Sequence, residues 1–196
     1  MSLWLCLRFP YLPLECLSQE AERPVVVLER ERVFNANDLA LAAGVSPGQN
    51  GQTVRSLLEA DEPLLLERDP IAEQQALEQL RLWCYSITPT LELWQGDSVQ
   101  LEVGSCLKLY RGLDSLTTQL HRDLGCRGYR CTMGLAANRH AAWLLSHDEA
   151  QGLTMNVPLK DRLAPLPVER LISDHTNPAP NKRFERDIAK LKKAGV

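Results

Sequence analysis

The order of strands and helices that the hydrophobic pattern predicts is the feature that most constrains this fold. Residues 3–9 are almost all apolar, as in a buried first strand. Helix, hairpin, helix and strand are expected after that strand, at 69–85, 91–103, 113–124 and 129–135. Strand, helix, strand, strand, helix, strand is the order of the ferredoxin-like βαββαβ unit. The sequence therefore predicts an α+β fold built on such a unit.

Start and turn signals support these elements. Asp69 followed by Pro70 places an N-cap residue before a proline at the first helical position. Apolar residues alternate on both sides of Gly96-Asp97, which predicts a hairpin with its turn there. Four leucines from Leu113 to Leu124 recur at helical spacing, and Asn138 is expected to begin one more helix, to about Leu145.

A second, small α/β piece is inserted between the first strand and the first helix, at residues 10–68. Pro10 and Pro13 end the first strand, because proline lacks the N–H that a strand ladder needs. The insertion is expected to hold a strand at 24–28, a helix from Asn35 to Ala43 closed by Gly44, a helix capped by Thr53 and reaching about Ala60, and an extended segment at 63–67.

Charge is distributed unevenly along the chain. The formal net charge of −3 excludes a uniformly basic nucleic-acid binder. Residues 181–196 hold six Lys/Arg and two Asp/Glu, a charge of +4, which leaves −7 for residues 1–180. We expect residues 151–180 to be a linker because they are rich in Pro, Asn and Asp. A basic helix is expected to follow it and to stop at the chain end, as in a fragment of a longer protein.

Cysteine and histidine patterns favour a reduced, cytoplasmic protein without a resident metal or cofactor. None of the six cysteines forms a C-x-x-C motif, and the four histidines show no ligand spacing. Cys6 lies in an apolar strand, where a packed thiol is expected rather than a nucleophile. No run of 18 apolar residues is present, so no membrane span is predicted.

Five segments in this order resemble motifs of the Y-family DNA polymerases. A βαββαβ palm with a small fingers insertion after its first strand is the organisation of that family. The resemblance divides the chain into palm (1–9 and 69–150), fingers (10–68), linker (151–180) and the start of a helix-hairpin-helix-like thumb (181–196). The segments that carry it are Leu3 to Glu15, Asn37 to Val45, Pro89 to Ser98, Met133 to Arg139 and Ile188 to Val196.

The positions of the family's metal ligands depart from the family pattern. Two-metal nucleotidyl transfer needs clustered carboxylates that hold both ions. The family's first-strand aspartate falls on Cys6, with Arg8 two residues later, and its hairpin Asp-Glu pair falls on Asp97-Ser98. By this resemblance only Asp97 is kept, as a vestigial ligand, and Arg8 would repel a divalent cation.

The nucleotide-binding positions depart as well. By resemblance, the family's triphosphate-binding Tyr and Arg fall on Asp38 and Leu41. Of the steric-gate pair only Tyr11 is aromatic, since the other position is Pro10. Arg139 takes the place of a phosphate-contacting lysine and is the candidate for a nucleotide phosphate.

These departures resemble the ImuB-type proteins, relatives of the UmuC and DinB polymerases that lack the catalytic acids. The resemblance implies a catalytically inactive accessory protein in DNA repair, SOS mutagenesis and error-prone translesion synthesis. It implies a sliding clamp, an ImuA-type protein and an error-prone replicative-type polymerase as partners. DNA would be contacted through its backbone by the basic end of the chain, at Lys182, Arg183, Arg186, Lys190, Lys192 and Lys193.

Two alternatives stay open at this point. An active translesion polymerase with an altered metal site would need Mg²⁺ held by Asp97 together with Glu92 or Glu15. A βαββαβ interaction module without a nucleic-acid role would need none of these groups. The geometry around Cys6, Arg8, Asp97 and Ser98 discriminates between the first alternative and an inactive homologue.

Overall fold

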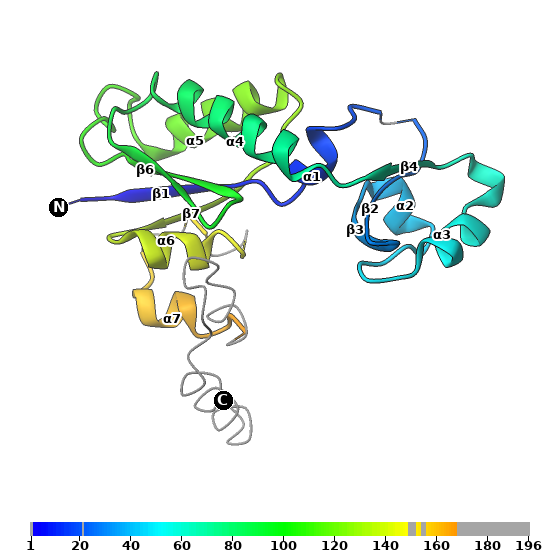
Figure 1. Cartoon of the computed structure of the whole chain (residues 1–196). Coiled ribbons are helices and arrows are strands. Elements are labelled where there is room, and N and C mark those ends of the chain that lie inside the picture. The colour runs from blue at the N-terminus through cyan, green and yellow to red at the C-terminus, as the bar shows by residue number, and fades with distance from the viewer. Residues whose placement is uncertain (1, 21, 149–151, 154–155, 168–196) are drawn as a thin grey trace. The chain divides into compact units, whose positions relative to one another are not determined.

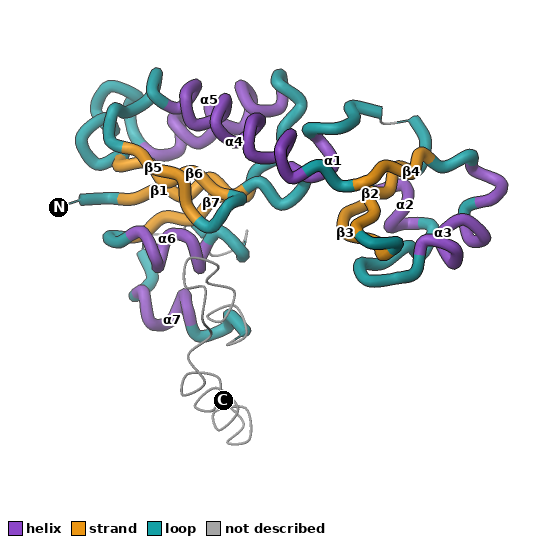
Figure 2. Tube along the Cα trace, viewed as in Figure 1, coloured by secondary structure: helices purple, strands orange, loops and turns teal. Residues whose placement is uncertain are grey.

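The computed structural model describes residues 2–20, 22–148, 152–153 and 156–167 of the chain (Figure 1). These residues form two compact units. Of the described residues, unit 1 contains 2–8, 84–108 and those from 132 to 167, and unit 2 contains those within 9–83 and 109–131. Helices and strands occur in both units, which confirms the predicted α+β class (Figure 2).

Unit 1 is built on a four-stranded antiparallel sheet. Its order is β5-β6-β1-β7, so the first strand of the unit lies between the third and the fourth. This is the sheet that the predicted βαββαβ order requires. The strands are β1 (Trp4–Arg8), β5 (Leu91–Trp94), β6 (Ser98–Glu102) and β7 (Thr132–Ala136).

Helix α6 (Arg139–Leu145) packs on one face of this sheet, against β7 and β1. Gly134 makes the close approach possible, because a Cβ there would lie 2.1 Å from the backbone oxygen of Ala142. Asn138 caps the helix, since its side chain accepts a hydrogen bond from the N–H of Ala141. The sequence prediction for this helix is confirmed.

The two faces of the sheet differ in polarity. Alternate residues point to opposite faces of a strand, and the cross-strand register places Leu5, Val99 and Leu135 away from α6. The face that carries α6 holds Cys6 opposite Gln100, and Arg8 opposite Ser98. Apolar side chains usually fill a sheet face that packs against a helix, whereas this face carries four polar or titratable side chains. We therefore expect a functional site on this face.

The inserted segment of unit 2 folds around a three-stranded sheet of order β3-β2-β4. Strand β2 (Val25–Glu29) is antiparallel to β3 (Arg32–Ala36) and parallel to β4 (Leu64–Glu67). Helices α2 (Asp38–Ala42) and α3 (Gly51–Leu57) and the 3-10 turn η1 (Glu59–Asp61) complete it. Its core consists of buried aliphatic side chains, among them Val26, Leu28, Val33, Val54 and Leu58.

The predicted helix starts in this insertion need correction. Asn35 and Ala36 belong to β3, because they pair with Val27 and Val26, and Asn37 caps the helix instead. The next helix begins at Gly51 and is capped by Asn50 rather than Thr53. In both cases an asparagine side chain accepts a hydrogen bond from a backbone N–H of the first turn.

The remaining helices of unit 2 are α1 (Leu12–Glu15), α4 (Pro70–Cys84) and α5 (Leu113–Gly125). Helix α1 had no counterpart in the sequence prediction, whereas α4 and α5 match it closely. Asp69 caps α4 as predicted, through hydrogen bonds from the N–H groups of Ile71 and Ala72. Leu77, Leu80 and Cys84 of this helix are buried, whereas Ile71 is 68% exposed.

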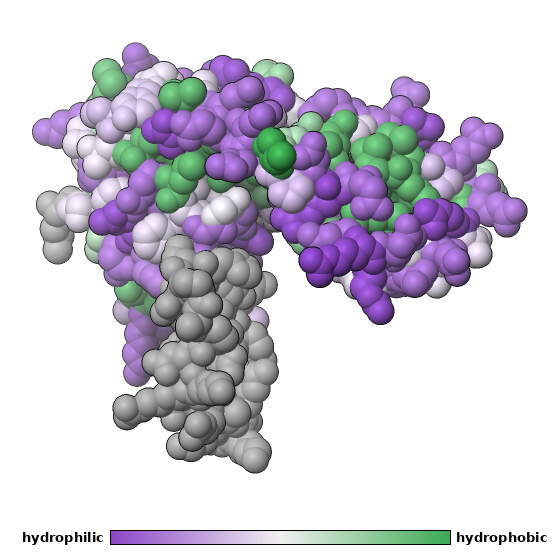
Figure 3. Space-filling model, viewed as in Figure 1, coloured by the Kyte–Doolittle hydropathy of each residue, from purple (hydrophilic) through white to green (hydrophobic). Residues whose placement is uncertain are grey.

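Two further differences from the sequence prediction concern the last part of the described chain. Strand β7 begins at Thr132, three residues later than expected. Helix α7 (Leu159–Leu163) forms inside the segment predicted as a linker, and the basic helix predicted for 182–193 lies outside the described residues. Hydrophobic side chains occur among hydrophilic ones at the surface (Figure 3). Within the part of the chain that the structure describes, no helix is both long and apolar enough to cross a membrane.

Candidate functional site

An arginine and an aspartate meet where β1 ends and β6 begins. The Nε of Arg8 donates a hydrogen bond of 2.9 Å to Oδ2 of Asp97. The hydroxyl of Ser98, which is fully buried, donates one of 2.5 Å to Oδ1 of the same carboxylate. Both oxygens of Asp97 therefore have a donor from the protein itself.

Cys6 lies two residues before Arg8 and is fully buried. Burial raises the pKa of its thiol to about 12. The thiol is therefore neutral at physiological pH, as expected of a packed group rather than an activated nucleophile. The sequence expectation of a packed thiol agrees with this geometry.

Arg139 also lies beside a carboxylate of the hairpin. Its Nη1 donates to Oε1 of Glu92, and its guanidinium lies over the ring of Trp4, 4.8 Å from the centroid. The side chain of Gln100 donates a 3.1 Å hydrogen bond to the backbone oxygen of Arg139. Glu92 and Trp4 thus contact the side chain of Arg139, Gln100 contacts its backbone, and Glu92 balances its charge.

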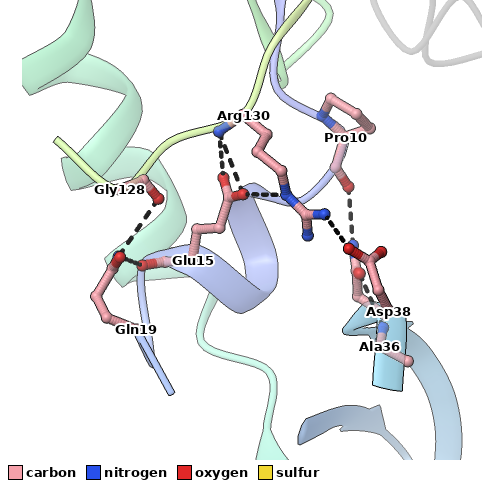
Figure 4. A network of polar contacts seen from close by, with 8 residues as sticks. Pro10, Glu15, Gln19, Ala36, Asp38, Gly128 and Arg130 are labelled. Carbon is pink, nitrogen blue, oxygen red and sulfur yellow. Dashed lines mark hydrogen bonds and ion pairs between the residues drawn. The ribbon is translucent and has the colours of Figure 1, made fainter. Parts of the chain in front are cut away.

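Unit 2 contains a comparable set of contacts, the Arg130 network, formed by Tyr11, Glu15, Asp38 and Arg130. Figure 4 shows Glu15, Asp38 and Arg130 of this network. The backbone N–H and the Nε of Arg130 donate to the carboxylate of Glu15 at 3.0 to 3.2 Å. Its Nη1 donates to Asp38 at 2.9 Å, and its guanidinium lies 3.8 Å from the ring centroid of Tyr11. Burial raises the pKa of Glu15, and the hydrogen bonds from Arg130 oppose this rise.

A cavity of about 320 Å³ adjoins the Arg130 network within unit 2. Its walls include the side chains of Glu15, Gln19, Asn37 and Tyr129. Gln19 is oriented by α1, since its Nε2 donates to the backbone oxygen of Glu15 at 2.8 Å. Among the described residues, no group of three or more His, Cys, Asp or Glu side chains is arranged to hold a metal ion.

A family model matches residues 11–147, which is more than two thirds of the chain, and its description is impB/mucB/samB family. The chain belongs to the impB/mucB/samB family. The match spans the insertion, both long helices, the hairpin and the strand that leads into α6. No curated protein matches the chain.

Solved structures similar to this impB/mucB/samB member are Y-family DNA polymerases. The insertion ternary complex of Dbh DNA polymerase has a TM-score of 0.62 at 16% identity, over 86% of this chain and 56% of that one. A Dbh-Dpo4-Dbh chimera has a TM-score of 0.61 at 15% identity, over 74% and 45%. DinB from Sulfolobus solfataricus has a TM-score of 0.55 at 16% identity, over 74% and 45%. The chain thus spans about half the length of these polymerases and shares their fold.

The structure brings together only part of the site predicted from sequence. Arg8, Asp97 and Ser98 are in contact, and Cys6 lies on the same sheet face. Tyr11 and Asp38 both contact Arg130, a residue that sequence reasoning missed. No local signal could have found it, because it is 115 residues from Glu15 and 92 from Asp38. Leu41 is 38% exposed, and the basic residues predicted to bind DNA, from Lys182 to Lys193, lie outside the described residues.

Proposed function

We propose that this impB/mucB/samB member is a catalytically inactive homologue of the Y-family polymerases that acts as an accessory protein in DNA repair and error-prone translesion synthesis. The observation that carries the proposal is the contact between Arg8 and Asp97. A cationic side chain sits on the one carboxylate that the resemblance assigns to the metal site. The ImuB-type relatives are the group that this pattern resembles.

The donor set around Asp97 does not fit the two Mg²⁺ ions of nucleotidyl transfer. Mg²⁺ demands nearly octahedral oxygen ligands, and a second ion needs further carboxylates. Here Cys6 offers a neutral buried thiol, and Asp97 accepts from Arg8 and Ser98. We therefore derive no catalytic step through a metal.

The carboxylates that an altered metal site would require are engaged elsewhere. Glu92 is paired with Arg139, and Glu15 is paired with Arg130 inside unit 2. Recruiting Glu92 would separate Arg139 from the carboxylate that balances its charge. Recruiting Glu15 would draw a carboxylate that is only 7% exposed away from Arg130. These pairs favour the inactive homologue over an active polymerase with a rewired site.

The accessory role supplies the expected partners. DNA would be bound by backbone contacts from the basic segment Lys182 to Lys193, with strong salt dependence and little sequence preference. By resemblance, the protein would link a sliding clamp, an ImuA-type protein and an error-prone replicative-type polymerase in the cytoplasm. The second alternative, an interaction module without a nucleic-acid role, predicts no DNA binding even at low salt.

Primer extension by the full chain tests the proposal. We expect no incorporation with either Mg²⁺ or Mn²⁺, at protein concentrations well above that of the primer-template. Asp97→Ala is the matched variant, since it removes the remaining carboxylate. Incorporation that Asp97→Ala abolishes would overturn the proposal, whereas incorporation that survives in Asp97→Ala would identify a contaminating polymerase. Binding of the same primer-template, measured by anisotropy over a salt series, separates a DNA-binding accessory protein from an interaction module.

A further inference from the structure

The two carboxylates that hold Arg130 differ strongly in exposure. The side chain of Glu15 is 7% exposed and accepts from both the backbone and the side chain of Arg130. The side chain of Asp38 is 75% exposed and accepts a single hydrogen bond, from Nη1. Glu15 therefore fixes the arginine in place, whereas Asp38 only occupies one of its outer donors.

Without Asp38, the remaining surroundings of Arg130 have the features of an anion site. A guanidinium carries five donors in one plane, and it suits the oxygens of phosphates and carboxylates. One edge of this guanidinium is held by Glu15 and one face lies on the ring of Tyr11, so its direction is fixed. Its side chain is 46% exposed, so the outer donors are accessible from solvent.

Asp38 is well placed to fill such a site permanently. It is the first residue of α2, directly after Asn37, whose side chain caps the helix and also accepts from the N–H of Val25. The backbone that carries Asp38 is therefore already fixed, and little entropy is lost when the carboxylate meets Arg130. An external anion would lose its translational and rotational freedom on binding.

We propose that Asp38 is a built-in occupant of an anion site formed by Arg130 and Tyr11. It takes the place of an external phosphate group and closes unit 2 to phosphates, whether free or in a nucleic-acid backbone. The inference concerns equilibrium binding of anions, so it stands or falls independently of primer extension.

Removing Asp38 should open the site. We expect Asp38→Asn to bind inorganic pyrophosphate about two- to five-fold more tightly than the unchanged protein, the factor that corresponds to an exposed ion pair. A fluorescein-labelled oligothymidylate should also bind more tightly to Asp38→Asn than to the unchanged protein if a nucleic-acid phosphate fits the site. Asp38→Asn combined with Arg130→Gln should lose this gain in affinity, because no guanidinium is left at the site. All variants are made in the full chain and compared at one low ionic strength.

Two matched variants separate this effect from a general change in charge. Asp114→Asn removes one exposed carboxylate from the first turn of α5, and Arg127→Gln removes a guanidinium that lies over Trp83. The proposal is overturned if the affinity for pyrophosphate rises no more in Asp38→Asn than in Asp114→Asn. It is also overturned if Asp38→Asn with Arg130→Gln keeps the higher affinity. It is also overturned if the gain disappears equally in Asp38→Asn with Arg127→Gln.

A second measurement covers the case in which loss of Arg130 unfolds the protein, because it leaves Glu15 buried without its partner. The Nε–H resonance of Arg130 in Asp38→Asn should shift on addition of pyrophosphate and should not shift in the unchanged protein. A resonance that is unmoved in Asp38→Asn, or one that moves equally in both proteins, contradicts the proposal.

Discussion

Arg8 is the last residue of β1 and Asp97 lies in the turn before β6, and the two charges balance each other at 2.9 Å. Their side chains are 22% and 33% exposed, so the pair lies in the regime where charges interact but remain partly screened. Arg139 with Glu92 and Arg130 with Asp38 repeat the same arrangement. At each of these positions an internal ion pair stands where the resemblance implies a metal ion or a phosphate.

Thiol chemistry gives a prediction at the same scale. Burial raises the pKa of Cys6 and of Cys84 to about 12, well above the value of about 8.5 for an unfolded thiol. A raised pKa means that the fold favours the neutral thiol, so this contribution to stability is present below about pH 8.5. It is lost as the pH rises from there towards 12.

Alkylation by iodoacetamide at pH 8, followed by peptide mapping, checks this assignment. We expect the exposed Cys126 to be modified in the native protein, while Cys6 and Cys84 react only after unfolding. Rapid native modification of Cys6 would contradict a buried, neutral thiol in the middle of β1.

The positions at which helices begin show how much of the structure can be predicted from local sequence alone. Asn138 was predicted as a cap and is one, because the helix that follows it has no competing strand. Asn35 was predicted as the start of a helix but lies in β3, since pairing with Val27 decides its conformation. Strand pairing is a tertiary effect. Here it decides which of two asparagines, Asn35 or Asn37, caps the helix, although both carry the same local capping signal.

Two asparagine caps give a matched prediction. Asn50 accepts one backbone hydrogen bond, so Asn50→Ala should lower the free energy of unfolding by about 1 kcal/mol. Asn37 also accepts from the N–H of Val25 and donates to the oxygen of Arg23, so Asn37→Ala should cost about 2 kcal/mol. Urea denaturation of both variants measures the difference. Equal losses would show that the extra contacts of Asn37 contribute nothing.

Close packing of α6 on β7 gives a prediction about glycine. In Gly134→Ala the new Cβ would lie 2.1 Å from the oxygen of Ala142 and 2.3 Å from the nitrogen of Ser146, both of them backbone atoms. We expect a loss of about 3 kcal/mol in the free energy of unfolding, from displacement of the helix. Gly125→Ala is the control, since nothing lies within 4 Å of its Cβ. Thermal unfolding of Gly134→Ala close to that of the control would rule out the close contact.

For the whole molecule, the strand order was predictable and the site was only partly so. The βαββαβ order followed from periodicity and turn residues, and the sheet order β5-β6-β1-β7 agrees with it. The juxtaposition of Arg8 with Asp97 depends on the register between β1 and β6, which the motif alignment approximated. Arg130 was invisible to the sequence because its partners come from distant segments.

Membership of the impB/mucB/samB family and a fold shared with Y-family polymerases set the frame for the whole chain. Within that frame we propose that Arg8 takes the place of a divalent cation at Asp97. A metal ion and the guanidinium of Arg8 would compete for the same carboxylate oxygens. Divalent-cation binding is therefore the property that separates an inactive homologue from a polymerase.

Titration of the full chain with Mn²⁺, followed by electron paramagnetic resonance of the free ion, tests this claim most directly. Asp97→Ala is titrated in parallel as the control. The account predicts that the unchanged protein binds no more Mn²⁺ than Asp97→Ala does, at every concentration up to the millimolar range. One or two sites that are present in the unchanged protein and lost in Asp97→Ala would contradict it.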